Sequence, residues 1–137
     1  MREKAWSEGG TTVAKDQDSS AALSVAMAYY QAWTSKDMDR AMTYVADGIV
    51  CEAPAGRVVG AEAYRAFLGP FAQMLTGADL IAGFGDDQTA VLVYDPHTVL
   101  VEHAPTGECF TVSDGKIVHS WLIFDRTPFA AARQKAT

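Results

Sequence analysis

The spacing of apolar residues predicts a long amphipathic helix near the start of the chain. Apolar residues recur at three- and four-residue steps after Ser19 and Ser20, which are good N-cap residues, and this pattern stops near Thr34. We therefore expect a helix of about 15 residues with one apolar face. Its predicted apolar stripe consists of Leu23, Met27, Tyr30 and Trp33.

Two further helices are predicted before residue 80. The first is short, is capped by Ser35 or Asp37, and has an inner face made by Met38, Ala41, Met42 and Val45. The second follows Gly60, and Gly77 suits the position just past its end. Pro70 inside this helix should kink it or split it in two. Its apolar face comprises Tyr64, Phe67, Leu68, Phe71 and Leu75.

Runs of β-branched and aromatic residues predict strands in the rest of the chain. The Asp114-Gly115 pair between two such runs is typical of a tight β-hairpin. Three helices followed by antiparallel strands indicate an α+β fold, with the helices packed on a mostly antiparallel sheet. The predicted strands are 49–53, 80–84, 90–94, 109–112 and 117–124.

Composition and charge narrow the classes of function. The 137 residues suit one domain, which we place at 19–137, with 1–18 as a mobile tail in which Trp6 is the candidate to dock. A net charge of −6 without a Lys/Arg cluster argues against nucleic-acid and membrane-surface partners. Because no apolar run suits a signal peptide or a membrane span, we expect a cytoplasmic protein.

The sequence offers no motif for a metal or a nucleotide cofactor. Cys51 and Cys109 lie far apart without a CxxC spacing, so we expect free thiols. The three histidines and the acidic residues near them match no ligand spacing, and a sheet scatters such side chains over both faces. The string GFGDD lacks the form of a phosphate-binding loop. We therefore expect no cofactor and no metal site among His97, His103, His119, Asp95, Glu102 and Glu108.

Three strings in this order resemble the nuclear transport factor 2-like superfamily, and in particular its SnoaL-like proteins. They are AYYQAWTSKDMDRAMTYVADGIVCEAP, GRVVGAEAYRAF and FTVSDGKIVHSWLIFDRTPF, and the resemblance spans about residues 20–129. It implies a cone-shaped half-barrel: a curved sheet with helices on its concave face, a deep cavity between them, and dimerisation through the outer face. The superfamily includes isomerases, cyclases, epoxide hydrolases and non-catalytic binders. The function of this chain therefore has to be inferred from the individual residues expected in the cavity.

Two positions depart from the catalytic patterns that the resemblance implies. Leu122 stands where SnoaL-like cyclases and limonene epoxide hydrolases carry an acid/base aspartate. Ala53 stands where ketosteroid isomerases carry their general base, and the neighbouring Glu52 should point to the other face. Tyr30 matches in register the isomerase tyrosine that stabilises an enolate. Proton abstraction by the usual aspartates is therefore not expected.

Alternation divides the last predicted strand into two faces. The resemblance places Ser120, Leu122 and Phe124 on the cavity wall. The opposite row of large side chains needs a cover, which a homodimer or the C-terminal segment could provide. That row consists of His119, Trp121 and Ile123. Asp125 lies on the same side, and we expect it to anchor the C-terminal segment.

Glu108 is the acidic residue best suited to chemistry in the cavity. It shares a strand face with Phe110 and Val112, so it should look into an apolar cavity, where burial raises a carboxyl pKa. The alternative is an exposed glutamate at the rim beside the Thr106-Gly107 turn.

Asp95 and His97 form a second candidate pair. If alternation survives Pro96, both face the same way and toward the pocket, and Asp95 could orient the imidazole. Alternatively, Pro96 bulges the strand and turns His97 outward.

Two functions remain open. One is an enzyme acting on a bulky hydrophobic substrate such as a polyketide or terpenoid, with Glu108 as acid or base and Tyr30, Asp95 and His97 as hydrogen-bonding partners. The other is a non-catalytic binding or scaffold protein, or a subunit that assists a larger enzyme. The enzyme and the binding protein would both hold a small hydrophobic molecule, whereas a scaffold would simply dimerise. The expected pocket residues are Met27, Trp33, Phe67, Phe71, Phe110, Leu122 and Phe124.

Overall fold

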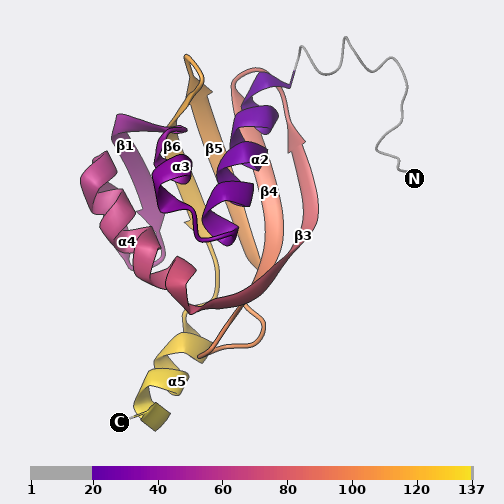
Figure 1. Ribbon diagram of the computed structural model, residues 1–137. Helices are drawn as coiled ribbons and strands as arrows, with labels where there is room; N and C mark the ends of the chain where they lie inside the picture. Colours follow the sequence, from indigo (N-terminus) through magenta and orange to yellow (C-terminus); the bar gives the residue numbers. More distant parts are fainter. Residues whose placement is uncertain (1–19, 137) are drawn as a thin grey trace.

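A curved sheet with helices on its concave face forms the body of the protein. The computed structural model describes residues 20–136, and the predicted tail with Trp6 lies outside this range (Figure 1). The helices are α2 (Ala21–Thr34), α3 (Met38–Met42), α4 (Ala61–Met74) and α5 (Thr127–Ala136). The strands are β1 (Val45–Ala53), β2 (Gly56–Val59), β3 (Leu75–Gly85), β4 (Thr89–Thr98), β5 (Thr106–Ser113) and β6 (Lys116–Ile123).

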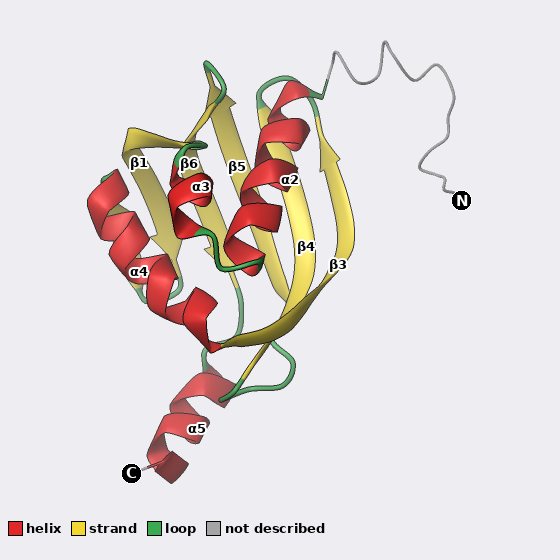
Figure 2. Cartoon of the chain, in the orientation of Figure 1, coloured by secondary structure: helices red, strands yellow, loops and turns green. Residues whose placement is uncertain are grey.

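The strand order in the sheet is β2-β1-β6-β5-β4-β3, and only the β1–β6 pair among these strands is parallel. Helices α2, α3 and α4 lie across one face of this sheet, and α5 lies beyond its end (Figure 2). The expected α+β architecture is therefore confirmed. Strand β2 and helix α5 were not predicted.

The buried face of α2 differs from the predicted stripe in its first half, whereas Tyr30 and Trp33 are buried as predicted. Ala22 and Ala26 are fully buried, whereas Leu23 and Met27 are only partly buried and lie beside Gly83 of β3. Small side chains at two successive turns let a helix approach a sheet closely. The aromatic residues that follow on the buried face of α2 are Tyr29, Tyr30 and Trp33.

Helix α4 continues through Pro70 as one helix. A proline costs one backbone hydrogen bond, and here the buried Leu68 and Ala72 on either side hold the helix to the core. The helix ends at Met74, because Leu75 takes an extended conformation with ψ of 134°. Gly77 therefore lies in β3 and does not terminate the helix.

The hairpin predicted at Asp114-Gly115 is confirmed. Both residues have positive φ, 52° and 75°, as expected for a turn of type I′. The turn joins β5 to β6 with Ser113 opposite Lys116. This register carries Glu108 and Ser120 to the same face of the sheet, where both are buried.

Strand β4 runs straight through Pro96. Pro96 pairs with Ala78 and is buried, and alternation continues to Thr98. The irregularities of this strand pair lie in β3, between Leu75 and Gly77 and between Leu80 and Ala82. Of the two alternatives left open by the sequence, alternation through Pro96 is therefore the correct one, and β4 has no bulge at the proline.

None of the helices within residues 20–136 is long and apolar enough to cross a membrane. Cys51 is buried and Cys109 is partly buried, and both are free thiols.

Candidate functional site

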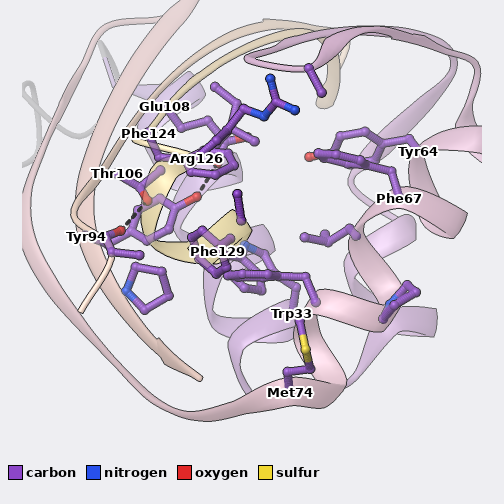
Figure 3. Close-up of a pocket in the computed structure, with 18 of the residues that line it drawn as sticks. Trp33, Tyr64, Phe67, Met74, Tyr94, Thr106, Glu108, Phe124, Arg126 and Phe129 are labelled. Atoms are coloured by element: carbon purple, nitrogen blue, oxygen red, sulfur yellow. Dashed lines mark hydrogen bonds between the residues drawn. The ribbon is translucent and has the colours of Figure 1, made fainter. Parts of the chain in front are cut away.

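A cavity of about 640 Å³ lies between the concave face of the sheet and the helices. Most of the side chains on its wall are apolar or aromatic, and they come from α2, α4, α5 and the strands β4–β6 (Figure 3). A volume of this size suits a drug-sized organic molecule. The lining includes Tyr29, Trp33, Tyr64, Phe67, Leu68, Phe71, Met74, Tyr94, Pro96, Thr106, Glu108, Leu122, Phe124, Arg126, Phe129 and Arg133.

Helix α5 covers one side of the cavity. Phe129 is 5% exposed, and its ring packs at 6.1 Å from that of Phe71 and at 5.8 Å from that of Phe124. Asp125 accepts a hydrogen bond of 2.9 Å from the backbone N–H of Thr127 at the start of this helix. The anchoring role expected for Asp125 therefore has a structural basis. Periodicity did not predict α5, because Phe129 is its one large apolar side chain.

Glu108 lies on the cavity wall and is only 3% exposed, so it is not a rim residue. Its Oε1 accepts a 2.7 Å hydrogen bond from the hydroxyl of Tyr94, and its Oε2 accepts one of 2.6 Å from Ser120. Tyr94 lies on β4 and Ser120 on β6, each two residues from the direct partner of Glu108. Three adjacent strands thus hold one carboxyl group in place.

The apolar surroundings control the protonation of Glu108. Burial raises the pKa of its carboxyl group, while the hydrogen bonds from Ser120 and Tyr94 oppose that rise. The net effect is a raised pKa. A carboxyl group with a raised pKa can both take and return a proton closer to neutral pH than an exposed glutamate can.

Two further tyrosines extend this polar cluster across the cavity. The hydroxyls of Tyr29 on α2 and Tyr64 on α4 share a hydrogen bond, and both side chains line the cavity. Burial raises the pKa of both phenols well above the ordinary value, and the nearby Glu108 raises them further. Both tyrosines are therefore neutral hydrogen-bonding groups at neutral pH.

Most of the expected pocket residues lie on the cavity wall. They are Trp33, Phe67, Phe71, Leu122 and Phe124. Met27 and Phe110 do not line it: Met27 packs beside β3, and Phe110 is fully buried with its ring edge-on to Tyr29 at 5.7 Å. These two predictions were wrong: Met27 is on the side of α2 that meets β3, and Phe110 packs in the core against Tyr29, which itself lines the cavity.

Tyr30 is buried beside the cavity without lining it. Its ring packs on Trp33 at 5.8 Å and on Tyr94 at 5.0 Å, and its hydroxyl has no hydrogen-bond partner among the described residues. Burial raises its pKa to about 12. The tyrosines that meet the cavity are Tyr29, Tyr64 and Tyr94, and sequence analysis had singled out none of them for the site.

Asp95 and His97 share one face of β4, as expected, but that face points away from the cavity. Tyr94, Pro96 and Thr98 alternate with them and are buried. Asp95 accepts hydrogen bonds from His103 at 2.8 Å and from the N–H of Ala104 at 2.7 Å. The pair is therefore separated from Glu108 by the sheet, and its expected position in the pocket was wrong.

The first strand places no carboxylate in the cavity. Ala53 is partly buried against the core, and Glu52 pairs on the outer face with Arg57 at 3.2 Å and with His119 at 3.4 Å. Leu122 is on the cavity wall. Glu108 is the one carboxyl group among the described residues that line the cavity.

The family model of the SnoaL-like domain matches residues 26–120. The chain belongs to this family. The matched segment runs from α2 to Ser120 and includes Glu108 and Tyr94, whereas α5 lies outside it.

Solved structures agree with this assignment. A protein from Kribbella flavida DSM 17836 is 54% identical, with a TM-score of 0.83 over 85% of this chain and 96% of that one. A nuclear transport factor 2-like protein of unknown function from Cytophaga hutchinsonii is 16% identical, with a TM-score of 0.66 over 77% of this chain and 91% of its own. No curated protein matches significantly.

A candidate polyketide cyclase from Xanthomonas campestris pv. campestris is 20% identical, with a TM-score of 0.66 over 82% of this chain and 96% of its own. At this identity the likeness shows the shared fold. The SnoaL-like domain of this chain therefore has the nuclear transport factor 2-like fold.

Proposed function

We propose that the protein binds a small, mostly apolar organic molecule in the cavity and that Glu108 exchanges a proton with it. The observation that carries this proposal is the position of Glu108, a buried carboxyl group on the wall of an otherwise largely apolar cavity. Polyketides and terpenoids are substrate classes whose largely apolar surface matches the apolar wall of this cavity. The reaction needs no cofactor, because an enol or enolate forms by proton transfer alone.

The neighbours of Glu108 support a role in acid/base chemistry. Tyr94 and Ser120 hold the carboxyl group in one orientation, and burial leaves little of it accessible to solvent. The Tyr29–Tyr64 hydroxyl pair lies on the opposite helices and can donate a hydrogen bond to a carbonyl oxygen of the substrate. Such a donor stabilises negative charge that develops on that oxygen.

Two arginines on the side of α5 suggest that the ligand also carries a negative group. Arg126 and Arg133 both line the cavity, and none of the ion pairs among the described residues involves either of them. A guanidinium at the mouth of an apolar cavity suits a carboxylate or sulfonate at one end of an apolar ligand.

Two fluorescent probes test this binding mode. Anilinonaphthalene sulfonate is apolar and anionic, while phenylnaphthylamine is apolar and neutral. We expect both probes to bind in the cavity. Each bound probe should then quench the fluorescence of Trp33. Arg126→Gln should weaken the binding of the anionic probe several-fold and leave the neutral probe unchanged. Equal effects on both probes would remove the anionic group from the proposal.

Proton exchange in D₂O tests the chemistry. A panel of apolar bicyclic and aromatic ketones should gain deuterium at the carbon beside the carbonyl, as mass spectrometry would detect. Glu108→Gln should slow this exchange by roughly 100-fold or more, the usual contribution of a general base. Glu62→Gln, at an exposed position on α4, is the matched control and should keep the wild-type rate.

A non-catalytic binding protein is the second candidate. It is favoured by Leu122 and Ala53, which cannot transfer protons, and by the fact that both oxygens of Glu108 already accept hydrogen bonds. In that case the probes bind, no ketone exchanges faster than in buffer, and Glu108→Gln changes nothing but stability.

We also propose that the protein is a homodimer that buries the outer face of the sheet. Trp121 is 55% exposed and Ile123 is 62% exposed on that face of β6, next to the partly exposed His119. The C-terminal helix does not offer the alternative cover, because its Phe129 packs toward the cavity. Large exposed apolar side chains in one row favour association with a second copy.

A further inference from the structure

We propose that Asp95, His97 and His103 form a binding site for a divalent transition-metal ion, with Zn²⁺ as the best fit. One potential ligand atom of each residue lies within 4.8 Å of those of the other two. The cluster lies on the face of β4 that points away from the cavity, so it is separate from Glu108 and independent of the proposed function. Imidazole and carboxylate groups together are common zinc ligands.

The tautomer of His97 is the strongest support for this site. Its Nδ1 lies 2.5 Å from the backbone carbonyl oxygen of Glu102, which can only accept a hydrogen bond, so Nδ1 carries the proton. In the neutral ring, Nε2 is then an acceptor. A histidine that ligates a metal characteristically donates its other N–H to a backbone carbonyl or carboxylate in this way.

A second acceptor faces that nitrogen. Oδ2 of Asp79 on β3 lies 2.9 Å from Nε2 of His97. An imidazole nitrogen and a carboxylate oxygen that both carry lone pairs repel each other at this distance unless a cation lies between them. That cation is either a proton on Nε2 of His97 or a metal ion bound by both groups. Asp79 contacts His97 alone and lies outside the three-residue group, so it would have to move to become a fourth ligand.

The opposite side of the cluster has a similar pair. Nδ1 of His103 lies 2.8 Å from Oδ2 of Asp95, and the two imidazole rings are 5.1 Å apart at an interplanar angle of 87°. Ligands of a tetrahedral zinc ion lie about 3.3 Å from one another. The observed separations, which reach at most 4.8 Å, must shorten by up to about 1.5 Å, and rotation of the exposed His103 side chain on its loop can provide this.

The local charge favours a cation. Asp79, Asp95 and Glu102 surround the two imidazoles, with Oε2 of Glu102 at 4.0 Å from Nε2 of His103. Within residues 20–136, none of the ion pairs brings a lysine or arginine to these three carboxylates. A bound divalent ion would therefore offset several negative charges at once.

The position of the site indicates a structural role. His103 lies in the loop between β4 and β5, at the end of the sheet near α5 (Figure 1). Pro96 and Ala104, each next to a proposed ligand in sequence, line the cavity from the other side. A metal ion here would fasten this loop to the sheet and so hold part of the cavity wall in place.

Titration of tag-free, chelator-treated protein tests the site. We expect calorimetry to detect one Zn²⁺ per chain and Co²⁺ to give the intense visible absorption of a tetrahedral site. His97→Ala, His103→Ala and Asp95→Asn should each weaken binding by at least roughly tenfold. His119→Ala is the matched control, because His119 also pairs with a carboxylate, that of Glu52, but lies outside the cluster. Binding that survives His103→Ala unchanged would overturn the proposal.

A measurement on the wild-type protein avoids variants that fail to fold. Nitrogen NMR of the imidazole rings should show that Zn²⁺ shifts the signals of His97 and His103 and not those of His119. Zn²⁺ should also raise the Tm, because a ligand that binds the folded state stabilises it. If Zn²⁺ perturbs neither ring, a proton occupies the position between His97 and Asp79, and the metal site is refuted.

Discussion

The hydroxyl of Tyr94 donates a 2.7 Å hydrogen bond to Oε1 of Glu108 across the β4–β5 pair. Both groups are buried on the wall of the cavity. Tyr94 thus partly replaces, for the ionised carboxylate, the solvent contacts that burial removes. Together with the hydrogen bond from Ser120, it opposes the rise in the pKa of Glu108 that burial causes.

Replacing Tyr94 by phenylalanine should raise the pKa of Glu108 further, because the hydrogen bond from Tyr94 lowers it in the native protein. The variant should also lose about 1 to 3 kcal/mol of stability, the usual cost of leaving a buried acceptor unpaired. Carbon NMR of the labelled carboxyl group across a pH titration measures the shift. Ser120→Ala should act in the same direction, and a lowered midpoint in both variants would contradict the arrangement described for this carboxyl group.

The contribution of Glu108 to the stability of the protein should fall as the pH rises through its folded pKa. That pKa is raised above the value in the unfolded chain, so the folded state binds the proton more tightly. The stabilising contribution is complete below the unfolded pKa, about 4.3, and is lost as the pH passes the folded pKa. Because glutamine does not titrate, Glu108→Gln should lack this pH-dependent loss of stability.

Urea unfolding between about pH 4 and 8 measures the effect. We expect the free energy of unfolding of Glu108→Gln to decrease less with rising pH than that of the wild type. Glu62→Gln, at an exposed position, should follow the wild-type curve. The buried groups around Glu108 do not titrate in this window, because Tyr29, Tyr64 and Tyr94 have raised pKa values and that of Cys51 is about 11. Parallel curves for wild type and Glu108→Gln would mean that Glu108 has an ordinary pKa.

Removing the ring of Phe129 should loosen the cover that α5 provides. Phe129→Ala deletes the contacts with Phe71 and Phe124, so the apolar probes should bind more weakly and dissociate faster. Stopped-flow fluorescence with phenylnaphthylamine measures the dissociation rate. Ala131→Gly, at an exposed position on the same helix, controls for loss of helix stability. An unchanged dissociation rate in Phe129→Ala would show that α5 does not retain the ligand.

A charged residue in place of Trp121 should dissociate the proposed dimer. Trp121→Glu puts a carboxylate in the centre of the apolar row on β6 and leaves the core untouched, because this side chain points outward. Light scattering after gel filtration should give twice the chain mass for the wild type and the chain mass for the variant. Glu62→Lys on α4 should leave the dimer intact, and a monomeric wild type would rule out this interface.

Local patterns were enough for much of the fold. Alternation and the Asp114-Gly115 turn predicted the last hairpin, and this hairpin brings Glu108 and Ser120 to one face. Helical periodicity located α2 and α4 and predicted the burial of Tyr30 and Trp33. It placed Leu23 and Met27 in the buried stripe of α2, where the structure buries Ala22 and Ala26 instead. Helix α5 depends on one ring docked at the cavity, which no local pattern reveals.

The candidate site residues also fall into those that the sequence predicted and those that only the tertiary structure brought together. Glu108 was predicted from its residue type and its apolar neighbours on one strand face, together with the cavity that the family resemblance implied. Which of the two faces of β4 lines the cavity depends on the neighbouring strands and helices. In the structure, Asp95 and His97 lie on the face that points away from the cavity. The meeting of these two residues with His103 depends on the path of a loop, and the hydroxyls around Glu108 come from four separate elements. Sequence patterns describe which face a residue occupies, whereas contacts between distant segments arise only from packing them together.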